Sequence, residues 1–372
     1  MKTFSDLIEE VQEPGLCHRC GGCVTFCTSI NYGALKLGDD GAPMYADREK
    51  CIECGLCYSI CPEIDEYQEE TKKVSGWTPP MGHIIETMTA RALDPIIRGK
   101  ATDGGVVTAL LVHLFDRGHI DGAIVTRQTG PFERDPMLAT SRQEIIDSAG
   151  FYFDSSHGVK HFGHDYSTYS PSVQEFRPMM QKGLRRVALV GTPCQIKTLR
   201  KMEAMSIVPS DSIKITLGLF CSGNFIFDQE ERRRLEEIAG IAWTDVRKIN
   251  IKDELMIHLT SGRLKTVPLE SIDFMKRYAC RFCPDYASEY ADVSFGGIGA
   301  DEGWTTVITR TPIGRAIMAD AKGNTLEIYD VSRRPEMTSQ IREKVRDKSM
   351  KKKAYSSRMH DSLVQAQRGG RG

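Results

Sequence analysis

Apolar and polar positions along this chain follow two periods, and together they predict alternating helices and strands. Apolar residues recur at helical spacing over residues 106–115. Short, nearly continuous apolar runs at 122–126, 186–191 and 213–220 predict buried strands. Helix and strand patterns that alternate in this way are typical of an α/β fold.

Other segments complete this picture. Two short strands are expected near residues 33–36 and 44–47, and a strand that ends in glycines is expected at 292–295. Residues 230–239 predict a charged helix, and residues 246–251 and 254–260 predict a hairpin. Beyond residue 340 the pattern is helical and charged, and it then becomes typical of disorder.

The pattern divides the chain into four parts. Residues 1–76 are expected to form an α+β ferredoxin-like domain, and residues 77–82, which contain two prolines and a glycine, a linker. Residues 83–335 form the expected α/β domain, and residues 336–372 a charged tail that is helical or disordered.

Composition places the chain among ordinary globular proteins. It has 372 residues, of which 40% are hydrophobic and 27% charged. No apolar run is long enough for a transmembrane helix, and the N-terminus does not have the pattern of a signal peptide. We therefore expect a cytoplasmic protein, with any peripheral membrane association coming through partner subunits.

The overall net charge is −1, but charge is unevenly distributed. Residues 1–80 carry 14 acidic and 7 basic residues, whereas residues 341–372 carry 10 basic and 3 acidic ones. The acidic front is suited to steering toward a basic partner, and the basic end is a solvated terminus or a docking segment. Because no continuous basic face is indicated, nucleic acid is not expected as a partner.

Cysteine spacing gives the strongest chemical signal. The chain has twelve cysteines, and eight of them form two runs of the form Cys-x2-Cys-x2-Cys-x3-Cys, with 23 residues between the runs. The first run consists of Cys17, Cys20, Cys23 and Cys27, and the second of Cys51, Cys54, Cys57 and Cys61. This spacing is typical of a ferredoxin with two [4Fe–4S] clusters.

In two-cluster ferredoxins the fourth cysteine of each run binds the other cluster. We therefore expect one cluster on Cys17, Cys20, Cys23 and Cys61, and the other on Cys51, Cys54, Cys57 and Cys27. Zinc is the alternative for a single run, but two identical runs favour iron–sulfur clusters. Thr28 stands where the second run has Pro62, a change that leaves the thiolate ligands intact.

Four cysteines remain: Cys194, Cys221, Cys280 and Cys283. Cys194 and Cys221 each follow a predicted strand, at the sheet edge where ligands of α/β proteins collect. From spacing alone, a pair of buried apolar cysteines beside a redox or metal pair Cys280/Cys283 is equally compatible. The glycine pair Gly104-Gly105 before a predicted helix is suited to phosphate binding but does not match a GxGxxG fingerprint.

The order of five sequence motifs resembles the beta subunits of coenzyme F420 hydrogenases and dehydrogenases. The motifs are Asp103-Gly-Gly-Val-Val-Thr-Ala-Leu, Gly191-Thr-Pro-Cys-Gln, Leu219-Phe-Cys, Cys280-x2-Cys and Ala291-Asp-Val-Ser-Phe-Gly-Gly. With the two cysteine runs in front, the whole chain is similar to the electron-input subunit of F420H2 dehydrogenase complexes. It is also similar to the front half of F420-dependent sulfite reductases.

The resemblance implies a set of cofactors and contacts. It implies FAD, coenzyme F420 as substrate and a third [4Fe–4S] cluster on Cys194, Cys221, Cys280 and Cys283. The residues expected to contact the flavin or F420 are Lys100, Asp103, Gly104, Gly105, Thr108, Arg186, Gly191, Thr192, Pro193 and Lys197. No protein acid or base is expected to act as a catalytic residue, because the cofactors perform the chemistry.

F420 carries a phosphate and a glutamate tail, so its site is expected to be basic. The other candidate cations near the motifs are Arg185, Arg200, Lys201, Arg277 and Arg281. For any single one of them, a solvated surface charge is the better interpretation. His157, His161 and His164 have spacing that would allow a metal site, although a loop surface or flavin contact fits them better.

The sequence therefore predicts an iron–sulfur flavoprotein oxidoreductase. Electrons would pass from reduced F420 through FAD and three clusters to another redox subunit of a complex or to a soluble ferredoxin. Two alternatives stay open. The same fold could use NADH or ferredoxin in place of F420, or the chain could be a flavin-free adaptor that moves electrons between other subunits.

Overall fold

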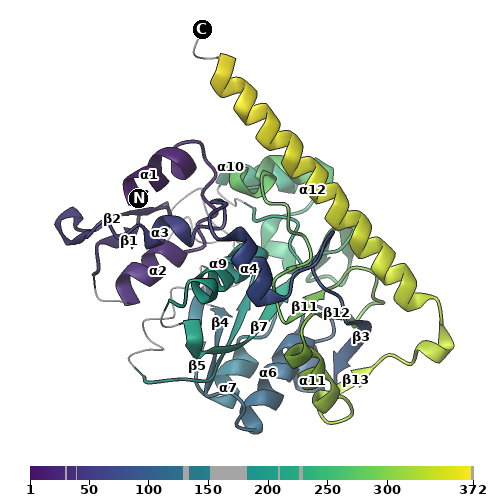
Figure 1. Ribbon diagram of the computed structural model, residues 1–372. Coiled ribbons are helices and arrows are strands. Elements are labelled where there is room, and N and C mark those ends of the chain that lie inside the picture. Colours follow the sequence, from purple (N-terminus) through teal and green to yellow (C-terminus); the bar gives the residue numbers. More distant parts are fainter. Residues whose placement is uncertain are drawn as a thin grey trace.

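The computed structural model describes residues 1–29, 32–38, 40–128, 134–150, 182–207, 210–225 and 229–369 (Figure 1). The N-terminal part is small and has short elements. They are α1 (Phe4–Leu7), the π-helical turn η1 (Ile8–Gln12), α2 (Gly22–Ser29), β1 (Leu35–Leu37), β2 (Pro43–Tyr45), η2 (Arg48–Lys50), α3 (Leu56–Ser59) and α4 (Gln68–Ser75). The strands β1 and β2 pair in antiparallel fashion, with Leu35 opposite Tyr45. A core of Phe4, Leu7, Val11 and Tyr58 packs beside the cysteines of both runs.

A mixed eight-stranded sheet forms the centre of the larger part. Its strand order is β13-β3-β12-β11-β7-β6-β4-β5. The strands are β3 (Glu86–Ala92), β4 (Gly122–Gln128), β5 (Arg134–Ala139), β6 (Val187–Gly191), β7 (Ile213–Leu219), β11 (Val293–Gly296), β12 (Thr305–Thr309) and β13 (Leu326–Ile328). The four central strands β11, β7, β6 and β4 run parallel, and the outer strands pair in antiparallel fashion. The three strands expected from apolar runs and the strand expected at 292–295 are these central ones, so their prediction is confirmed.

Helices cover both faces of this sheet. On one face, α5 (Pro95–Lys100), α6 (Val106–Asp116), α7 (Arg142–Asp147) and α11 (Pro312–Ala321) share a core with the strands, in which Leu110 and Met318 pack near Leu217. On the other face, α9 (Pro193–Ala204) buries Ile196 and Leu199 against Leu189 of β6. Both cores contain the alternate side chains of the same strands, as a sheet buried on two faces requires.

The start of α9 is fixed locally by its sequence. Thr192 is the N-cap, and Gln195 completes a capping box, because its Oε1 accepts from the Thr192 N–H at 2.9 Å. Pro193 occupies the first helical position, where a missing N–H has no cost. The turn after β6 therefore leads directly into a helix, and Cys194 lies in its first turn.

The N-terminal part packs against α9. Phe26 and Ile60 belong to the same hydrophobic cluster as Ile196 and Leu199. Trp77, in the segment expected to be a linker, donates its Nε1–H to Glu289 at 2.8 Å and stacks on Tyr290. The segment is therefore irregular in structure but partly packed against the larger part.

Lys201 of α9 makes the most concentrated polar contact between the two parts. Its side chain is fully buried. Its Nζ donates to the carbonyl oxygens of Ser59 at 3.1 Å and Cys61 at 2.8 Å, and also to the carbonyl oxygen of Ile64. Ser59 is the last residue of α3 and the other two carbonyls follow it, at a helix end, where backbone acceptors lack intrahelical partners.

The substitution Lys201→Met is expected to destabilise the protein by about 2 kcal/mol, because the partly buried carbonyls of Ser59 and Ile64 lose the Lys201 donor, while that of Cys61 keeps the Ile64 N–H. The measurement is the urea midpoint of unfolding under anaerobic conditions. Lys197→Met is the matched control, since Lys197 lies one turn earlier on α9 and, within the described part of the chain, donates to one carbonyl, that of Pro62 at 2.7 Å. Equal losses in the two variants would contradict the special role of Lys201.

A second, smaller sheet and a long helix complete the structure. The sheet has the order β10-β9-β8, from β8 (Val246–Ile251), β9 (Glu254–Leu259) and β10 (Leu264–Pro268). It shares a core with α10 (Gln229–Ala239) and the 3₁₀ segment η7 (Leu269–Met275). The predicted hairpin and charged helix are confirmed here. Short 3₁₀ turns lie at η5 (Ser210–Ser212), η6 (Trp243–Asp245), η8 (Tyr278–Arg281) and η9 (Val331–Arg333).

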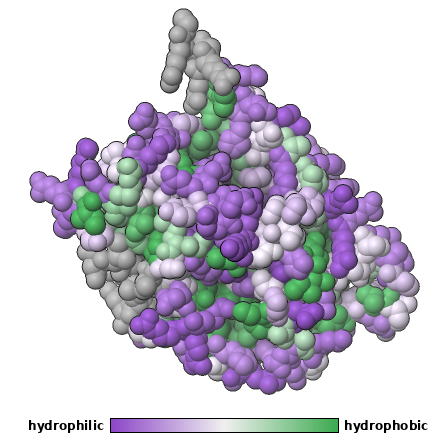
Figure 2. Space-filling view, in the orientation of Figure 1, coloured by the Kyte–Doolittle hydropathy of each residue, from purple (hydrophilic) through white to green (hydrophobic). Residues whose placement is uncertain are grey.

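The C-terminal segment is a single long helix, α12 (Met337–Gly369), within the described residues. Figure 1 shows it in yellow along one side of the larger part. Met337, Ile341 and Val345 bury their side chains with Tyr286 and Ile298. Of the two states expected for the tail, the described residues show the helical one. On the face in Figure 2, hydrophilic residues predominate and hydrophobic residues form small patches between them.

Candidate functional site

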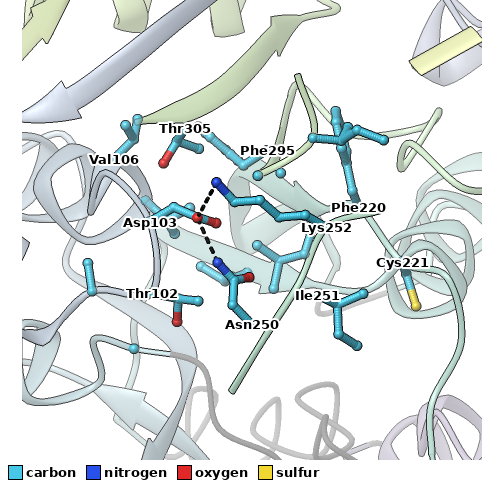
Figure 3. A pocket seen from close by; sticks show the side chains of 18 of the residues that line it. Thr102, Asp103, Val106, Phe220, Cys221, Asn250, Ile251, Lys252, Phe295 and Thr305 are labelled. Carbon is cyan, nitrogen blue, oxygen red and sulfur yellow. Dashed lines mark hydrogen bonds and ion pairs between the residues drawn. The ribbon is translucent and has the colours of Figure 1, made fainter. Parts of the chain in front are cut away.

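A cavity of about 250 Å³ opens at the carboxyl ends of the parallel strands (Figure 3). Its lining includes the ends of β6, β7 and β11, for example Gly191, Leu219 and Phe295. The loop before α6 and the β8–β9 turn close it from other sides, through Asp103 and Lys252. Ligands of open α/β sheets bind at this edge, so the cavity is the leading candidate for a cofactor site.

Asp103 ties the walls of the cavity together. Asn250 donates its Nδ2–H to Asp103 Oδ1 at 3.0 Å, and Lys252 Nζ lies 3.6 Å from the same oxygen. Both contacts are drawn in Figure 3. The neighbouring Gly104 N–H donates to Thr305 Oγ1 at 2.9 Å, and Gly105 is the N-cap of α6 with φ +74°, a conformation that favours glycine. The Asp-Gly-Gly loop is therefore fixed to both the hairpin and β12.

The second cysteine run meets the last cysteine of the first run. Cys27 lines a small cavity together with Cys51, Cys54 and Cys57. Cys27 also interacts electrostatically with Cys51 and Cys54, and it lies near the backbone N–H groups of Ala34 and Leu35. The four side chains thus converge although they come from both runs.

The complementary grouping joins Cys61 to cysteines of the first run. Cys61 interacts electrostatically with Cys20 and Cys17, as does Cys23. Burial raises the pKa of Cys57 and Cys61 to about 12. Such thiols lose their protons when a metal coordinates them.

The last four cysteines also gather, although they are far apart in sequence. Cys221 follows β7 and interacts electrostatically with Cys280 and Cys283, and Cys283 interacts with Cys194 at the start of α9. The Asn224 N–H donates to Cys280 Sγ at 3.2 Å. Cys221 also lines the 250 Å³ cavity, so this cysteine group and the cavity share a wall (Figure 3).

His18 lies between the first run and this third group. Its buried ring forms an ion pair with Glu63 at 2.5 Å and hydrogen-bonds to the thiol of Cys280. Burial lowers the pKa of His18, but the Glu63 carboxylate together with Cys280 and Cys194 outweighs it, so this pKa lies well above its ordinary value. Burial raises the pKa of Cys280, but the hydrogen bond and charge of His18, the charge of Arg277 and the Asn224 N–H together lower it to about 7.

A second contact joins the same two groups. Cys20 Sγ lies 3.5 Å from Thr198 Oγ1, and Cys20 also interacts electrostatically with Cys194. Arg277 adds a third link, since its Nη1 donates to the His18 carbonyl oxygen at 3.0 Å. The first run and the third group are therefore direct neighbours.

The described residues contain no group of three His, Cys, Asp or Glu side chains placed to hold a single metal ion. Four thiolates around one zinc ion stand about 4 Å apart, because Zn–S bonds are about 2.3 Å long. An iron–sulfur cube is a larger body with a thiolate at each corner.

The residues expected at a flavin or F420 site are only partly brought together. Asp103, Gly105, Thr108 and Gly191 line the cavity. Gly104 supports its wall through Thr305, while Thr192 and Pro193 form the start of α9 and do not belong to the lining.

The three predicted cations lie elsewhere. Lys100 pairs with Asp147 at 2.6 Å, and Lys197 reaches toward Pro62 of the N-terminal part. Arg186 pairs with Asp121 at 2.5 Å before β6, at the opposite edge of the sheet from the cavity.

The other basic candidates also have structural partners or lie outside the lining. Arg200 pairs with Asp292 at 3.0 Å in the protein interior, and Arg281 pairs with Asp273 at 3.4 Å. Arg185 is exposed. His157, His161 and His164 lie outside the described residues. Proximity to a motif in sequence therefore did not identify the cations of the cavity.

Among the residues that the structure describes, the cations that line the cavity are Lys252 and Lys348. Lys252 lies in the β8–β9 turn and Lys348 on α12, where it pairs with Asp253 at 3.3 Å. The sequence carries no local signal for either role, because tertiary folding alone brings the hairpin and α12 over the sheet edge.

Comparison with known families identifies the family of this chain. Residues 184–333 match the C terminus of the coenzyme F420 hydrogenase/dehydrogenase beta subunit, and residues 87–162 match its N-terminal part. The F420 hydrogenase of Methanosarcina barkeri has a beta subunit that is 32% identical over 248 residues, which are 65% of this chain and 80% of that protein. This chain belongs to the family of coenzyme F420 hydrogenase/dehydrogenase beta subunits.

This member of the beta-subunit group also carries a 4Fe–4S dicluster domain, matched over residues 9–73. The F420H2 dehydrogenase of Methanosarcina mazei has a subunit that is 27% identical over 319 residues, 82% of each chain. A chain of the F420-reducing [NiFe] hydrogenase complex of Methanosarcina barkeri has a TM-score of 0.61 and 28% identity, covering 74% of this chain and 93% of its own length. The family resemblance seen in the motifs is thus confirmed. No helix among the described residues is long and apolar enough to cross a bilayer.

Proposed function

We propose that this chain is an iron–sulfur flavoprotein oxidoreductase subunit that passes electrons from reduced coenzyme F420 to a partner redox protein. FAD and three [4Fe–4S] clusters are the proposed resident cofactors. When bound, the flavin exchanges a hydride for single electrons, which the clusters carry one at a time.

Three groups of cysteines are the proposed cluster ligands. One group is Cys17, Cys20, Cys23 and Cys61; the second is Cys51, Cys54, Cys57 and Cys27; the third is Cys194, Cys221, Cys280 and Cys283. Support comes from the cavity that Cys27 shares with the second run and from the neighbouring N–H groups, such as that of Asn224 on Cys280. Hydrogen bonds to sulfur are a usual feature of such sites.

The 250 Å³ cavity is the proposed flavin site. Glycines at several wall positions, including Gly191, Gly223 and Gly296, allow a flat ring to approach the backbone. Its volume is below the range of about 300–1,000 Å³ that is usual for sites of drug-sized ligands. The proposed site therefore encloses one part of the FAD molecule, and the rest of the dinucleotide extends out of the cavity. Lys252 and Lys348 supply positive charge for phosphate groups.

The observation that carries the proposal is the continuity of these sites. Cys221 belongs both to the cavity wall and to the third cysteine group. His18 then connects Cys280 of the third group to the loop of the first run. The second run lies beyond, with the exposed side chain of Ile52 directly after Cys51. The proposed path for electrons from the cavity to the surface therefore passes from one cysteine group to the next. A partner subunit or soluble ferredoxin would dock near the second run.

Addition of reduced F420 to the protein purified anaerobically with iron and FAD is expected to bleach the flavin and cluster absorbance together. We expect about twelve irons, one four-iron cube per cysteine group, and about one FAD per chain. Absorbance spectra recorded through the titration are the measurement.

The same experiment separates the alternatives. Bleaching by NADH or reduced ferredoxin, with no response to F420, would overturn the donor and keep the cofactor assignment. Protein that takes up iron but no flavin would indicate an adaptor that only moves electrons between other subunits. The proposed setting is cytoplasmic, with any membrane association through partner subunits.

A further inference from the structure

The C-terminal helix α12 places a charged side chain against the third cysteine group. Lys352 Nζ donates to the carbonyl oxygen of Cys221 at 2.7 Å and to that of Asp285 at 2.8 Å. The ammonium interacts electrostatically with Cys221, Cys280 and Cys283. A lysine that lies about 70 to 130 residues later in the chain than these cysteines therefore belongs to their immediate surroundings.

Other residues of α12 hold the helix in place at this position. Ser356 is buried and its Oγ donates to the Phe282 carbonyl oxygen, which lies between Cys280 and Cys283 in sequence. His360 Nε2 lies 3.3 Å from the same oxygen. Lys353 pairs with the buried Glu289 at 2.6 Å. Because Lys353 has its own carboxylate, Lys352 is the ammonium of α12 that faces the cysteines.

We propose that Lys352 is a positioning residue of the third cluster, whose fixed positive charge raises the reduction potential of that cluster. The inference rests on the proposed function, since it requires a cluster on these four cysteines. Reduction adds one negative charge to a cluster, and a nearby cation in a largely water-free site stabilises the reduced form. An electron that arrives from the cavity would therefore be stabilised on the third cluster, close to Cys221.

The carbonyl contacts give Lys352 a second effect, which the experiment has to separate from the first. They tie the loop after β7 to the loop after Cys283, so removal of the side chain also loosens the site. Lys352→Met removes both the charge and the hydrogen bonds. Lys352→Gln removes the charge and keeps an amide donor, whereas Lys352→Arg keeps the charge.

The test is a redox titration followed by electron paramagnetic resonance on the full chain, with iron content measured in parallel. The signal of the third cluster is assigned by its loss in Cys221→Ser. In Lys352→Met and Lys352→Gln we expect the equilibrium constant for one-electron reduction of this cluster to fall about tenfold. This fall lowers its midpoint potential by about 59 mV. Lys352→Arg should retain most of the potential, and Lys351→Met, at an exposed position of the same helix, should behave as wild type.

The outcomes distinguish failure of the proposed function from failure of the tuning role of Lys352. About eight irons in the wild type would mean that the third cluster is absent, and the proposed function itself would fail. Twelve irons with an unchanged potential in Lys352→Gln would overturn the tuning role. Loss of the third cluster in Lys352→Met and also in Lys352→Gln would equally overturn it, because the side chain would then serve assembly of the site.

Discussion

Substitution of Cys27 by alanine is expected to remove the four irons held with the second run, although Cys27 belongs to the first run in sequence. The reason is the cavity that Cys27 shares with Cys51, Cys54 and Cys57. A [4Fe–4S] cube that loses one of four thiolates is exposed on that corner and loses iron. Iron content should fall from about twelve to about eight per chain, with loss of the resonance signal of one cluster.

Paired variants make this prediction sharp. Cys27→Ala should give the same residual spectrum as Cys51→Ala, and Cys61→Ala the same as Cys17→Ala. Both pairs should retain flavin, because the cavity lies in the larger part of the chain. A match of Cys27→Ala with Cys17→Ala would show that each run holds its own cluster.

Gly297→Leu is expected to abolish flavin binding while it leaves the iron content unchanged. A Cβ at position 297 would lie 2.7 Å from Asp103 Oδ2, so a larger side chain would enter the cavity and displace that carboxylate. The backbone of Gly297 does not have a positive φ, so the new side chain introduces no backbone strain. We expect at least a tenfold fall in bound FAD, measured by absorbance after protein precipitation, and no reduction of the clusters by F420.

Gly99→Leu is the matched control, because position 99 is an exposed site on α5 with nothing within 4 Å of the added Cβ. Helix propensity favours leucine over glycine, so this variant should be as stable as the wild type or slightly more stable. A variant at 297 that retained one FAD per chain would place the flavin away from Asp103.

Sequence patterns predicted the parts of the fold that depend on local chemistry. The central strands were found because they are buried on both faces, and an apolar run such as that of β6 reports burial directly. The strand β12 was not foreseen, since Thr305, Thr306 and Thr309 are polar residues whose burial depends on neighbouring strands. Its hydroxyl groups are satisfied only in the folded sheet, for example by the bond from Thr306 to Ile298.

The candidate site shows the same division. The glycine pair Gly104-Gly105 was predicted from its place before a helix, which is a local cause, whereas Asp103 and Gly191 were expected from the family resemblance. The basic residues near the motifs were proposed as ligand contacts, yet Arg186 points to the far edge of the sheet and Lys201 holds the N-terminal part. Lys252, Lys348 and Lys352 reach the site only through tertiary packing, so no sequence period could indicate them.

The position of α12 has a consequence for how the protein is made. Ribosomes synthesise a chain from its N-terminus to its C-terminus. Both cysteine runs are therefore made well before residue 352. The third cysteine group is complete in sequence at Cys283, but its wall of Lys352 and Ser356 arrives about 70 residues later. Until α12 is synthesised, this cysteine group lacks the contacts of Lys352 and Ser356, so we expect α12 to complete the surroundings of the site after the four cysteines have been made.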